Sequence, residues 1–198
     1  MPYSQFNIET IQLALGVQVQ DRQHLFSEIP AIRYSDFLAQ SLEECSPLAI
    51  VVGTEKSRSE FIIAPILFEI KKQLSDKVSL FSGKEFNVEP EKGLSGFCDF
   101  LISRSPEQLF IKYPVGTIVE AKNDSISSGI DQCIAEMVAA KIFNQRHQNP
   151  IQTIYGVITT DSLWKFLRLT DNIVEVDLNE YYLSKVGKIL GILRHCVS

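Results

Sequence analysis

The sequence lacks any hydrophobic run long enough to cross a membrane. Its longest apolar runs are Pro47–Val52 and Phe61–Phe68, whereas a membrane-spanning helix needs about 20 apolar residues. Residues 1–10 also lack the basic segment and apolar stretch that are typical of a secretory signal. We therefore expect a cytoplasmic protein with no membrane partner.

Cysteine and histidine are scarce and scattered. The chain has 4 cysteines, none of them in a CxxC pair, and its 3 histidines do not stand at zinc-ligand spacing from them. This spacing gives no indication of a zinc site or of an iron–sulfur cluster. We expect free thiols, mostly buried, in a reducing compartment.

Basic residues are also fewer than acidic ones. The chain carries 19 Lys and Arg against 24 Asp and Glu, which gives a net charge of −5. That balance argues against a protein that binds nucleic acid through bulk charge alone. Most of the excess lies in residues 1–50, which hold 2 basic and 6 acidic side chains.

What is present suits one soluble globular domain. Apolar residues make up 45% of the 198 residues and charged residues 22%, which are ordinary values for such a domain. We expect a single domain over residues 1–198. Its parts are a helical N-terminal extension (1–50), a core (54–160), and a C-terminal hairpin with a helix (161–198). Two short helices are expected in the extension. The first covers residues 7–15 and ends at Gly16, and the second covers residues 34–45 and ends before Pro47.

The core begins with a helix. Ser57 and Glu60 have the spacing of a capping box, in which each side chain satisfies a free backbone donor at a helix start. Apolar residues then recur at helical spacing as far as Leu74. Pro65 lies inside this helix, where a missing backbone donor predicts a kink.

Strand patterns follow the helix. Three strands separated by short connections predict an antiparallel meander, and a helix then crosses to a fourth strand that should run parallel to the third. The sequence therefore predicts an α/β fold with a mixed sheet flanked by helices. The expected elements are strands at 78–88, 97–103 and 115–122, a turn at Asn123-Asp124-Ser125, a helix from a capping box at Ser128–Asp131 to Asn144, a strand at 151–160, a hairpin at 163–178 and a final helix through 186–193.

Charged side chains interrupt two of these apolar strands. Glu120 and Lys122 share one face of the third strand because side chains alternate. Asp99 lies near the start of the second strand, beside the third if the two form a hairpin. Two carboxylates aimed at one side of neighbouring strands are suitable ligands for Mg²⁺, which takes oxygen ligands and keeps several waters. The ammonium of Lys122 would then stand beside a metal-bound water.

Asp99 followed by Glu120-Ala121-Lys122 resembles the PD-(D/E)XK nuclease superfamily, over roughly residues 54–160. The resemblance implies a restriction-endonuclease-like core of helix, three strands, helix and strand. It also implies that Asp99 and Glu120 bind one or two metal ions, that Lys122 assists the attacking water, and that Glu60 on the first helix completes the site. Gln132 stands where a RecB-like branch has a glutamine.

The sequence departs from the family pattern in two places. Cys98 precedes Asp99 where the family often has proline, and Glu136 stands four residues after Gln132 where the RecB-like branch has tyrosine. A second tripeptide of the same kind, Glu69-Ile70-Lys71, falls inside an expected helix. In the bland alternative, Glu120 and Lys122 are an exposed pair on a half-solvated strand.

We expect Mg²⁺- or Mn²⁺-dependent hydrolysis of phosphodiester bonds in nucleic acid, DNA rather than RNA. Asp99, Glu120, Glu60 and the Ala121 carbonyl are the expected metal ligands, and Gln132 is a supporting hydrogen-bonder. One alternative is an inactive nuclease fold that binds nucleic acid or serves in an assembly, and the other is a plain interaction domain. A homodimer or a larger assembly is a further expectation.

Overall fold

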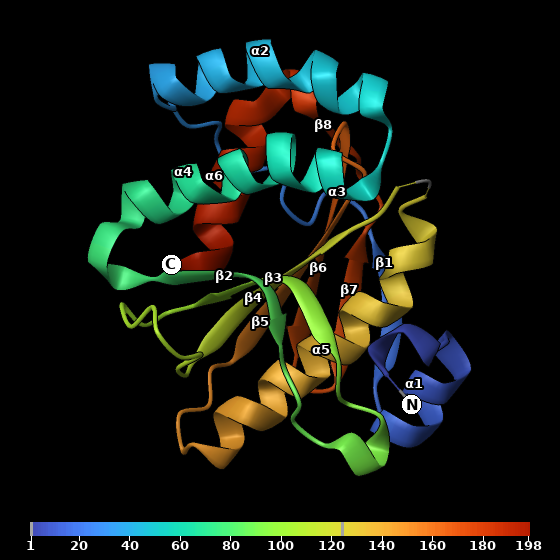
Figure 1. Ribbon diagram of the computed structural model, residues 1–198. Coiled ribbons are helices and arrows are strands. Elements are labelled where there is room, and N and C mark those ends of the chain that lie inside the picture. Colours follow the sequence, from blue (N-terminus) through green and yellow to red (C-terminus); the bar gives the residue numbers. More distant parts are fainter. Residues whose placement is uncertain (1, 124) are drawn as a thin grey trace.

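The computed structural model describes residues 2–123 and 125–198, and everything below refers to these residues. It is an α/β fold with a mixed, open sheet flanked by helices (Figure 1). The strands are β1 (Gln18–Arg22), β2 (Ser79–Glu85), β3 (Phe97–Ser103), β4 (Val115–Ala121), β5 (Thr153–Thr159), β6 (Leu163–Thr170), β7 (Ile173–Asp177) and β8 (Tyr181–Tyr182).

The strand pairing confirms the expected meander and crossover. The order across the sheet is β1-β7-β6-β5-β4-β3-β2, and β8 pairs with β6. β2, β3 and β4 are antiparallel neighbours, and β5 runs parallel to β4 after the crossover helix. The hairpin of β6 and β7 extends the sheet beyond β5 in antiparallel pairs.

Helices cover both faces of the sheet. They are α1 (Ile8–Leu15), α2 (Asp36–Val52), α3 (Glu55–Arg58), α4 (Ala64–Leu74), α5 (Ser127–Arg146) and α6 (Val186–Val197). A π-helical turn (Ser59–Ile63) joins α3 to α4. Short 3₁₀ turns are η1 (Tyr3–Gln5), η3 (Ser75–Lys77), η4 (Pro90–Lys92) and η5 (Leu183–Lys185).

Two hydrophobic clusters lie on opposite faces of the sheet. One is formed with α5, α1 and η1, and the other with α4 and α6. Figure 1 shows α2 as the outermost layer, lying across α4 and α6. None of the helices within residues 2–123 and 125–198 has the length and apolar character needed to cross a membrane.

The N-terminal segment differs from the expected helical extension. Helix α1 is as predicted, with Asn7 as its cap and Gly16 ending it at a φ of 65°. Residues Gln18–Arg22, however, form β1, an edge strand that runs parallel to β7. The expected end of the second helix before Pro47 is wrong, because α2 continues to Val52. Pro47 is exposed, so water can satisfy the backbone carbonyl that the proline leaves unbonded.

The expected capping box at Ser57 is wrong by three residues. Thr54 is the cap, and its side chain accepts a hydrogen bond from the Ser57 N–H at 3.1 Å. Ser57 is instead buried, and its hydroxyl donates to the Ala49 and Thr54 carbonyls at 3.2 and 2.8 Å. Pro65 does not lie inside a continuous helix as expected: a π-helical turn ends at Ile63, and the proline occupies the first turn of α4, where a missing backbone donor costs little.

The start of α5 also differs from its expected capping box. The helix begins at Ser127 without a side-chain cap, and the Ser128 hydroxyl donates to the Ser125 carbonyl at 2.7 Å. The turn expected at Asn123-Asp124-Ser125 includes Asp124, which lies outside the described residues.

One side chain covers the edge of the sheet at β2. Gln108, from the connection between β3 and β4, lies beside Leu80 on this edge strand. Its side-chain oxygen accepts from the Leu80 N–H at 3.2 Å, and its side-chain nitrogen donates to the Leu80 carbonyl at 2.6 Å. The Gln108 amide thus bonds the backbone of Leu80 as a neighbouring strand would.

Candidate active site

Asp99 and Glu120 come together because β3 and β4 are neighbours. Phe100 pairs with Val119 in the antiparallel register, so Asp99 and Glu120 each lie one step beyond that pair. The Asp99 carboxylate accepts a hydrogen bond from the Ala121 N–H at 2.8 Å. The expectation that the hairpin brings the two carboxylates together is therefore met.

Lys122 links the strand to helix α5. Its ammonium pairs with Glu120 and also donates to the Gln132 side-chain oxygen at 3.2 Å. Gln132 in turn donates to Glu136 at 3.0 Å. The structure therefore brings Asp99, Glu120, Lys122 and Gln132 into one polar cluster, and adds Glu136 to it.

Burial raises the pKa values of both carboxylates. Glu120 is 1% exposed, and burial together with the negative charge of Asp99 raises its pKa to about 8, against the opposing effect of Lys122. Burial also raises the pKa of Asp99, although the Ala121 N–H and Lys122 oppose the change. The bland alternative of an exposed Glu120–Lys122 pair is wrong, because Glu120 is buried.

Nearby acidic side chains stabilise the charged form of Lys122. Burial disfavours the charged form, but Glu120, Asp99 and Glu55 outweigh this effect and raise the pKa of Lys122. In the metal-free protein Lys122 therefore donates hydrogen bonds and supplies positive charge, and it does not act as a base at neutral pH.

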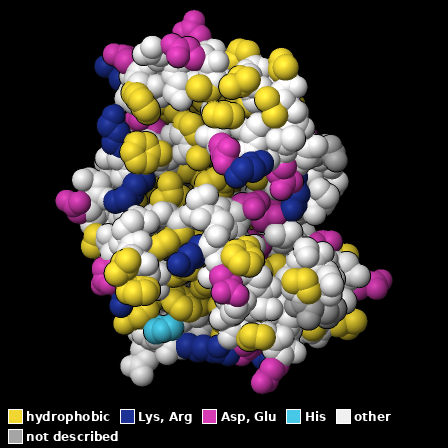
Figure 2. Space-filling model, in the orientation of Figure 1, with side chains coloured by type: hydrophobic (Ala, Val, Ile, Leu, Met, Phe, Trp, Pro, Cys, Tyr) yellow, Lys and Arg dark blue, Asp and Glu magenta, His cyan; other side chains and the backbone are white. Residues whose placement is uncertain are grey.

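A cavity of about 240 Å³ opens beside this cluster. Asp99 and Ala121 line its sheet side, and Glu55, Lys56 and Glu60 line its helical side. Figure 2 shows acidic and basic side chains gathered at the middle of this face, between the helical layer and the sheet. The cavity is the route by which a ligand can reach Asp99.

Glu60 is at the rim of this cavity, as an exposed residue. Its side chain is 52% exposed and pairs with Lys56 at 2.7 Å. Glu55 is the acidic residue that sequence reasoning missed here: its charge acts on both Glu120 and Lys122. Thr54 is the cap of α3, and Glu55 is its first residue. A cap assigned at Thr54 instead of Ser57 would therefore have placed Glu55 at the helix start, beside the predicted site.

The donor set fits a hard divalent cation bound mostly by water. One Glu120 carboxylate oxygen is buried without a hydrogen-bond partner, and Asp99 opposes its negative charge. Mg²⁺ is often held by only one or two carboxylates, and it would relieve this repulsion. Within the described ranges no three His, Cys, Asp or Glu side chains are grouped closely enough to hold a metal. Asp99 and Glu120 are the two carboxylates that such an ion would contact first.

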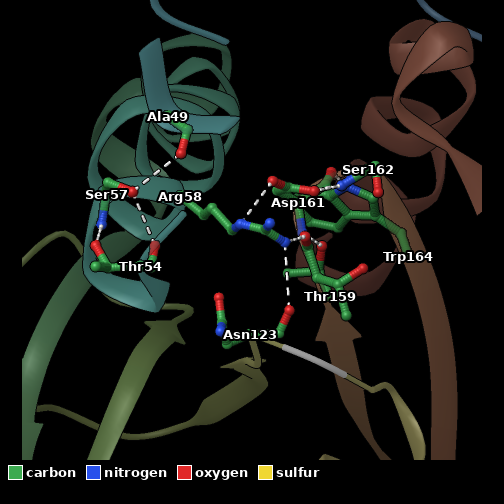
Figure 3. A network of polar contacts seen from close by, with 10 residues as sticks. Ala49, Thr54, Ser57, Arg58, Asn123, Thr159, Asp161, Ser162 and Trp164 are labelled. Carbon is green, nitrogen blue, oxygen red and sulfur yellow. Dashed lines mark hydrogen bonds and ion pairs between the residues drawn. The ribbon is translucent and has the colours of Figure 1, made fainter. Parts of the chain in front are cut away.

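An arginine fixes the helical wall of the cavity to the sheet (Figure 3). Arg58 in α3 pairs with Asp161 at 3.4 Å and donates to the carbonyls of Asn123 and Thr160 at 3.3 and 3.4 Å. Asn123 and Thr160 follow the ends of β4 and β5. Arg58 therefore holds α3, which carries Glu55, against the ends of β4 and β5. Glu120 and Lys122 lie at the end of β4.

Aromatic side chains of the C-terminal hairpin do not form a surface for stacking on bases. Trp164 and Phe166 are fully buried, and Tyr181 is nearly so. The Trp164 indole donates to the Asp161 carbonyl at 2.8 Å. These three rings belong to the core, whereas the neighbouring Tyr182 is exposed.

No protein-family model matches the chain, and no characterised protein is significantly similar to it in sequence. The chemistry of this protein is therefore inferred from the cluster of Asp99, Glu120 and Lys122 and from its surroundings.

The buried carboxyl of Glu120 predicts a pH-dependent stability. Its pKa is about 8 in the folded protein and near 4.5 when unfolded, so the folded state holds the extra proton between these values. The free energy of unfolding should therefore fall by a few kcal/mol as pH rises from 5 to 9 without metal. Lys122, with its raised pKa, contributes no change over this range.

Urea unfolding of the wild type and of Glu120→Gln at pH 5, 7 and 9 measures this effect. The variant should lose less stability than the wild type over the series, and Glu60→Gln, at the exposed rim, should behave like the wild type. Equal slopes for the wild type and Glu120→Gln would contradict the assignment.

Gly129 leaves room for the Lys122 side chain under α5. A Cβ at this position would lie 2.9 Å from Ile158 Cγ2 and 3.0 Å from Lys122 Cγ. Gly129→Ala should therefore displace Lys122 and lower the metal-dependent cleavage expected from the sequence by about 10- to 100-fold, because small displacements at a reacting centre are costly. Cleavage kinetics beside Ser128→Ala, an exposed change on the same helix, check this. Unchanged kinetics would mean that Lys122 tolerates the displacement.

Proposed function

We propose that this protein is a metal-dependent hydrolase of phosphodiester bonds in nucleic acid, DNA rather than RNA. The observation that carries the proposal is the buried contact of Glu120 with Lys122 beside Asp99, at a cavity open to solvent. The order α4, β2, β3, β4, α5, β5 agrees with the restriction-endonuclease-like core that the sequence resemblance implies. Fold resemblance supports the proposal less than the cluster itself does.

The metal is proposed to be Mg²⁺ or Mn²⁺. Asp99 and Glu120 would hold it, the Ala121 carbonyl is a further proposed ligand, and Glu55 or Glu60 would act from the opposite wall of the cavity. When bound, such an ion supplies an activated water and charge neutralisation at the phosphoryl group. Its charge would also remove the like-charge penalty that raises the pKa of Glu120.

The side chains have separate proposed roles. Lys122, as an ammonium, stabilises negative charge that develops on the phosphoryl oxygens, which is the general use of a fixed cation in such sites. With a cation bound, the ionised Glu120 would orient this ammonium through their ion pair. Gln132 accepts a second hydrogen bond from it at 3.2 Å and limits its motion.

The test is cleavage of single- and double-stranded DNA and RNA with Mg²⁺ or Mn²⁺, by the wild type and by Asp99→Asn purified in parallel. We expect the wild type alone to cleave DNA, and chelation to abolish cleavage. Calorimetric titration with Mn²⁺ should show binding to the wild type that is at least tenfold weaker in Asp99→Asn. Equal cleavage by both proteins would indicate contamination, and the proposal would then fall.

The rival function is an inactive nuclease fold that binds nucleic acid or serves in an assembly. It predicts DNA binding that survives chelation, without strand cleavage. The net charge of −5 favours the enzyme, because affinity without a cation or a partner should be weak. A homodimer remains part of the proposal, and sedimentation of the full chain measures it.

A further inference from the structure

A row of polar side chains runs from β4 into the buried face of α5. Lys122 pairs with Glu120 and donates to the Gln132 oxygen at 3.2 Å, and the Gln132 nitrogen donates to Glu136 at 3.0 Å. Gln132 and Glu136 lie four residues apart on α5 and so share one helix face. The row ends at Glu136, which is fully buried.

The two neighbours of Gln132 determine how its amide lies. A glutamine amide accepts with its oxygen and donates with its nitrogen, and a lysine ammonium only donates. The Gln132 oxygen must therefore face Lys122, which leaves the nitrogen to face Glu136. A carboxyl oxygen of Glu136 accepts that bond in either protonation state. An apolar residue at position 136 would leave the buried nitrogen without a partner, and the amide would lose its fixed orientation.

We propose that Glu136 is a positioning residue: it accepts the Gln132 N–H, fixes that amide, and through it holds the Lys122 ammonium against Glu120. The catalytic consequence rests on the proposed function of Lys122. The orientation of the amide does not, and it is testable in the absence of any activity.

The burial of Glu136 is difficult to explain by packing alone. Its second carboxyl oxygen accepts no hydrogen bond of ordinary geometry, and the Cys98 thiol, a weak donor, is the polar group that faces this carboxyl. Neighbours on the same helix, Cys133, Met137 and Ala140, are apolar and fully buried, so a hydrophobic side chain suits this face better. Burial, and then Glu120, raise the pKa of Glu136 far above its ordinary range. A contact with Gln132 that serves the site explains why a carboxyl stands here.

A double-mutant cycle tests whether Glu136 acts through Gln132. Glu136→Met should lower kcat for Mn²⁺-dependent DNA cleavage about tenfold with little change in KM. Glu136→Gln retains an acceptor and should stay within about threefold of the wild type. In a Gln132→Ala background, Glu136→Met should add less than a twofold loss. An undiminished loss in that background would mean that Glu136 acts independently of Gln132, and would overturn the proposal.

A second measurement needs no cleavage. In ¹⁵N-labelled full-length protein without metal, the Gln132 side-chain amide protons should exchange with solvent at least tenfold more slowly than those of an exposed glutamine such as Gln12. Glu136→Met should remove this protection and Glu136→Gln should restore it.

The two measurements separate the two proposals. If the wild type shows protected Gln132 amide protons that depend on Glu136 but does not cleave DNA, the proposed function fails and the positioning role stands. If the wild-type Gln132 amide exchanges as fast as that of Gln12, the positioning role fails, whether or not Glu136→Met folds.

Discussion

Replacing Lys122 with Met is expected to lower metal-dependent cleavage by about 10²- to 10³-fold, the usual cost of removing one group that stabilises a charged transition state. Met keeps most of the apolar stem of the side chain and removes only its charge and donors. Loss of Lys122 raises the pKa of Glu120 further, but metal binding should persist at pH 9, because a bound cation itself favours the ionised carboxylate. Single-turnover cleavage and Mn²⁺ titration at that pH separate the two effects.

Lys141→Met is the matched control for this change. Lys141 lies on α5 away from the site, and its ammonium bonds to Asn172 at 2.7 Å. Its loss should leave cleavage within about twofold of the wild type, since nothing joins it to the cluster. Cleavage by Lys122→Met at the wild-type rate would exclude Lys122 from the chemistry.

The second large effect is on stability. Arg58→Met removes the cation that pairs with Asp161, a residue only 3% exposed. Breaking a buried pair by removing one partner costs about 3–5 kcal/mol, because an uncompensated charge remains buried. We expect Arg58→Met to lower the free energy of unfolding by about 3 kcal/mol, as measured by urea denaturation at pH 7.

The Lys56–Glu60 pair provides the comparison for Arg58. Its two side chains are 82% and 52% exposed, and surface pairs of this kind contribute about 0–1 kcal/mol. Lys56→Met should therefore unfold at nearly the wild-type urea concentration. A loss for Arg58→Met no larger than that for Lys56→Met would show that Asp161 is solvated, and that Arg58 does not hold α3 to the strand ends.

The core of the site was predictable because strand periodicity and hairpin order are local properties of the sequence. Alternation along β4 places Glu120 and Lys122 on one face, and the short connection after β3 brings Asp99 beside them. The mixed sheet followed from the same patterns. Glu55 was missed because both Thr54 and Ser57 are suitable helix caps. Glu60, three residues after Ser57, completes a capping-box spacing and so favoured the wrong cap.

Other features depend on contacts that no local pattern contains. The polar segment Gln18–Arg22 becomes a strand only because β7 offers it an edge. Pro47 is accepted within α2 because its side of the helix faces solvent. Glu136 was noted in the sequence as a departure from the family pattern, but its place in a row with Gln132 and Lys122 depends on how α5 packs beside β4.

The Gln108 amide on β2 affects how this sheet can meet other chains. An uncovered edge strand invites a peptide or a second sheet to add to it, and proteins commonly protect such edges. At Leu80 both backbone groups are already engaged by Gln108. A continuous intermolecular sheet, with its risk of fibrous aggregation, is therefore interrupted at this position of β2.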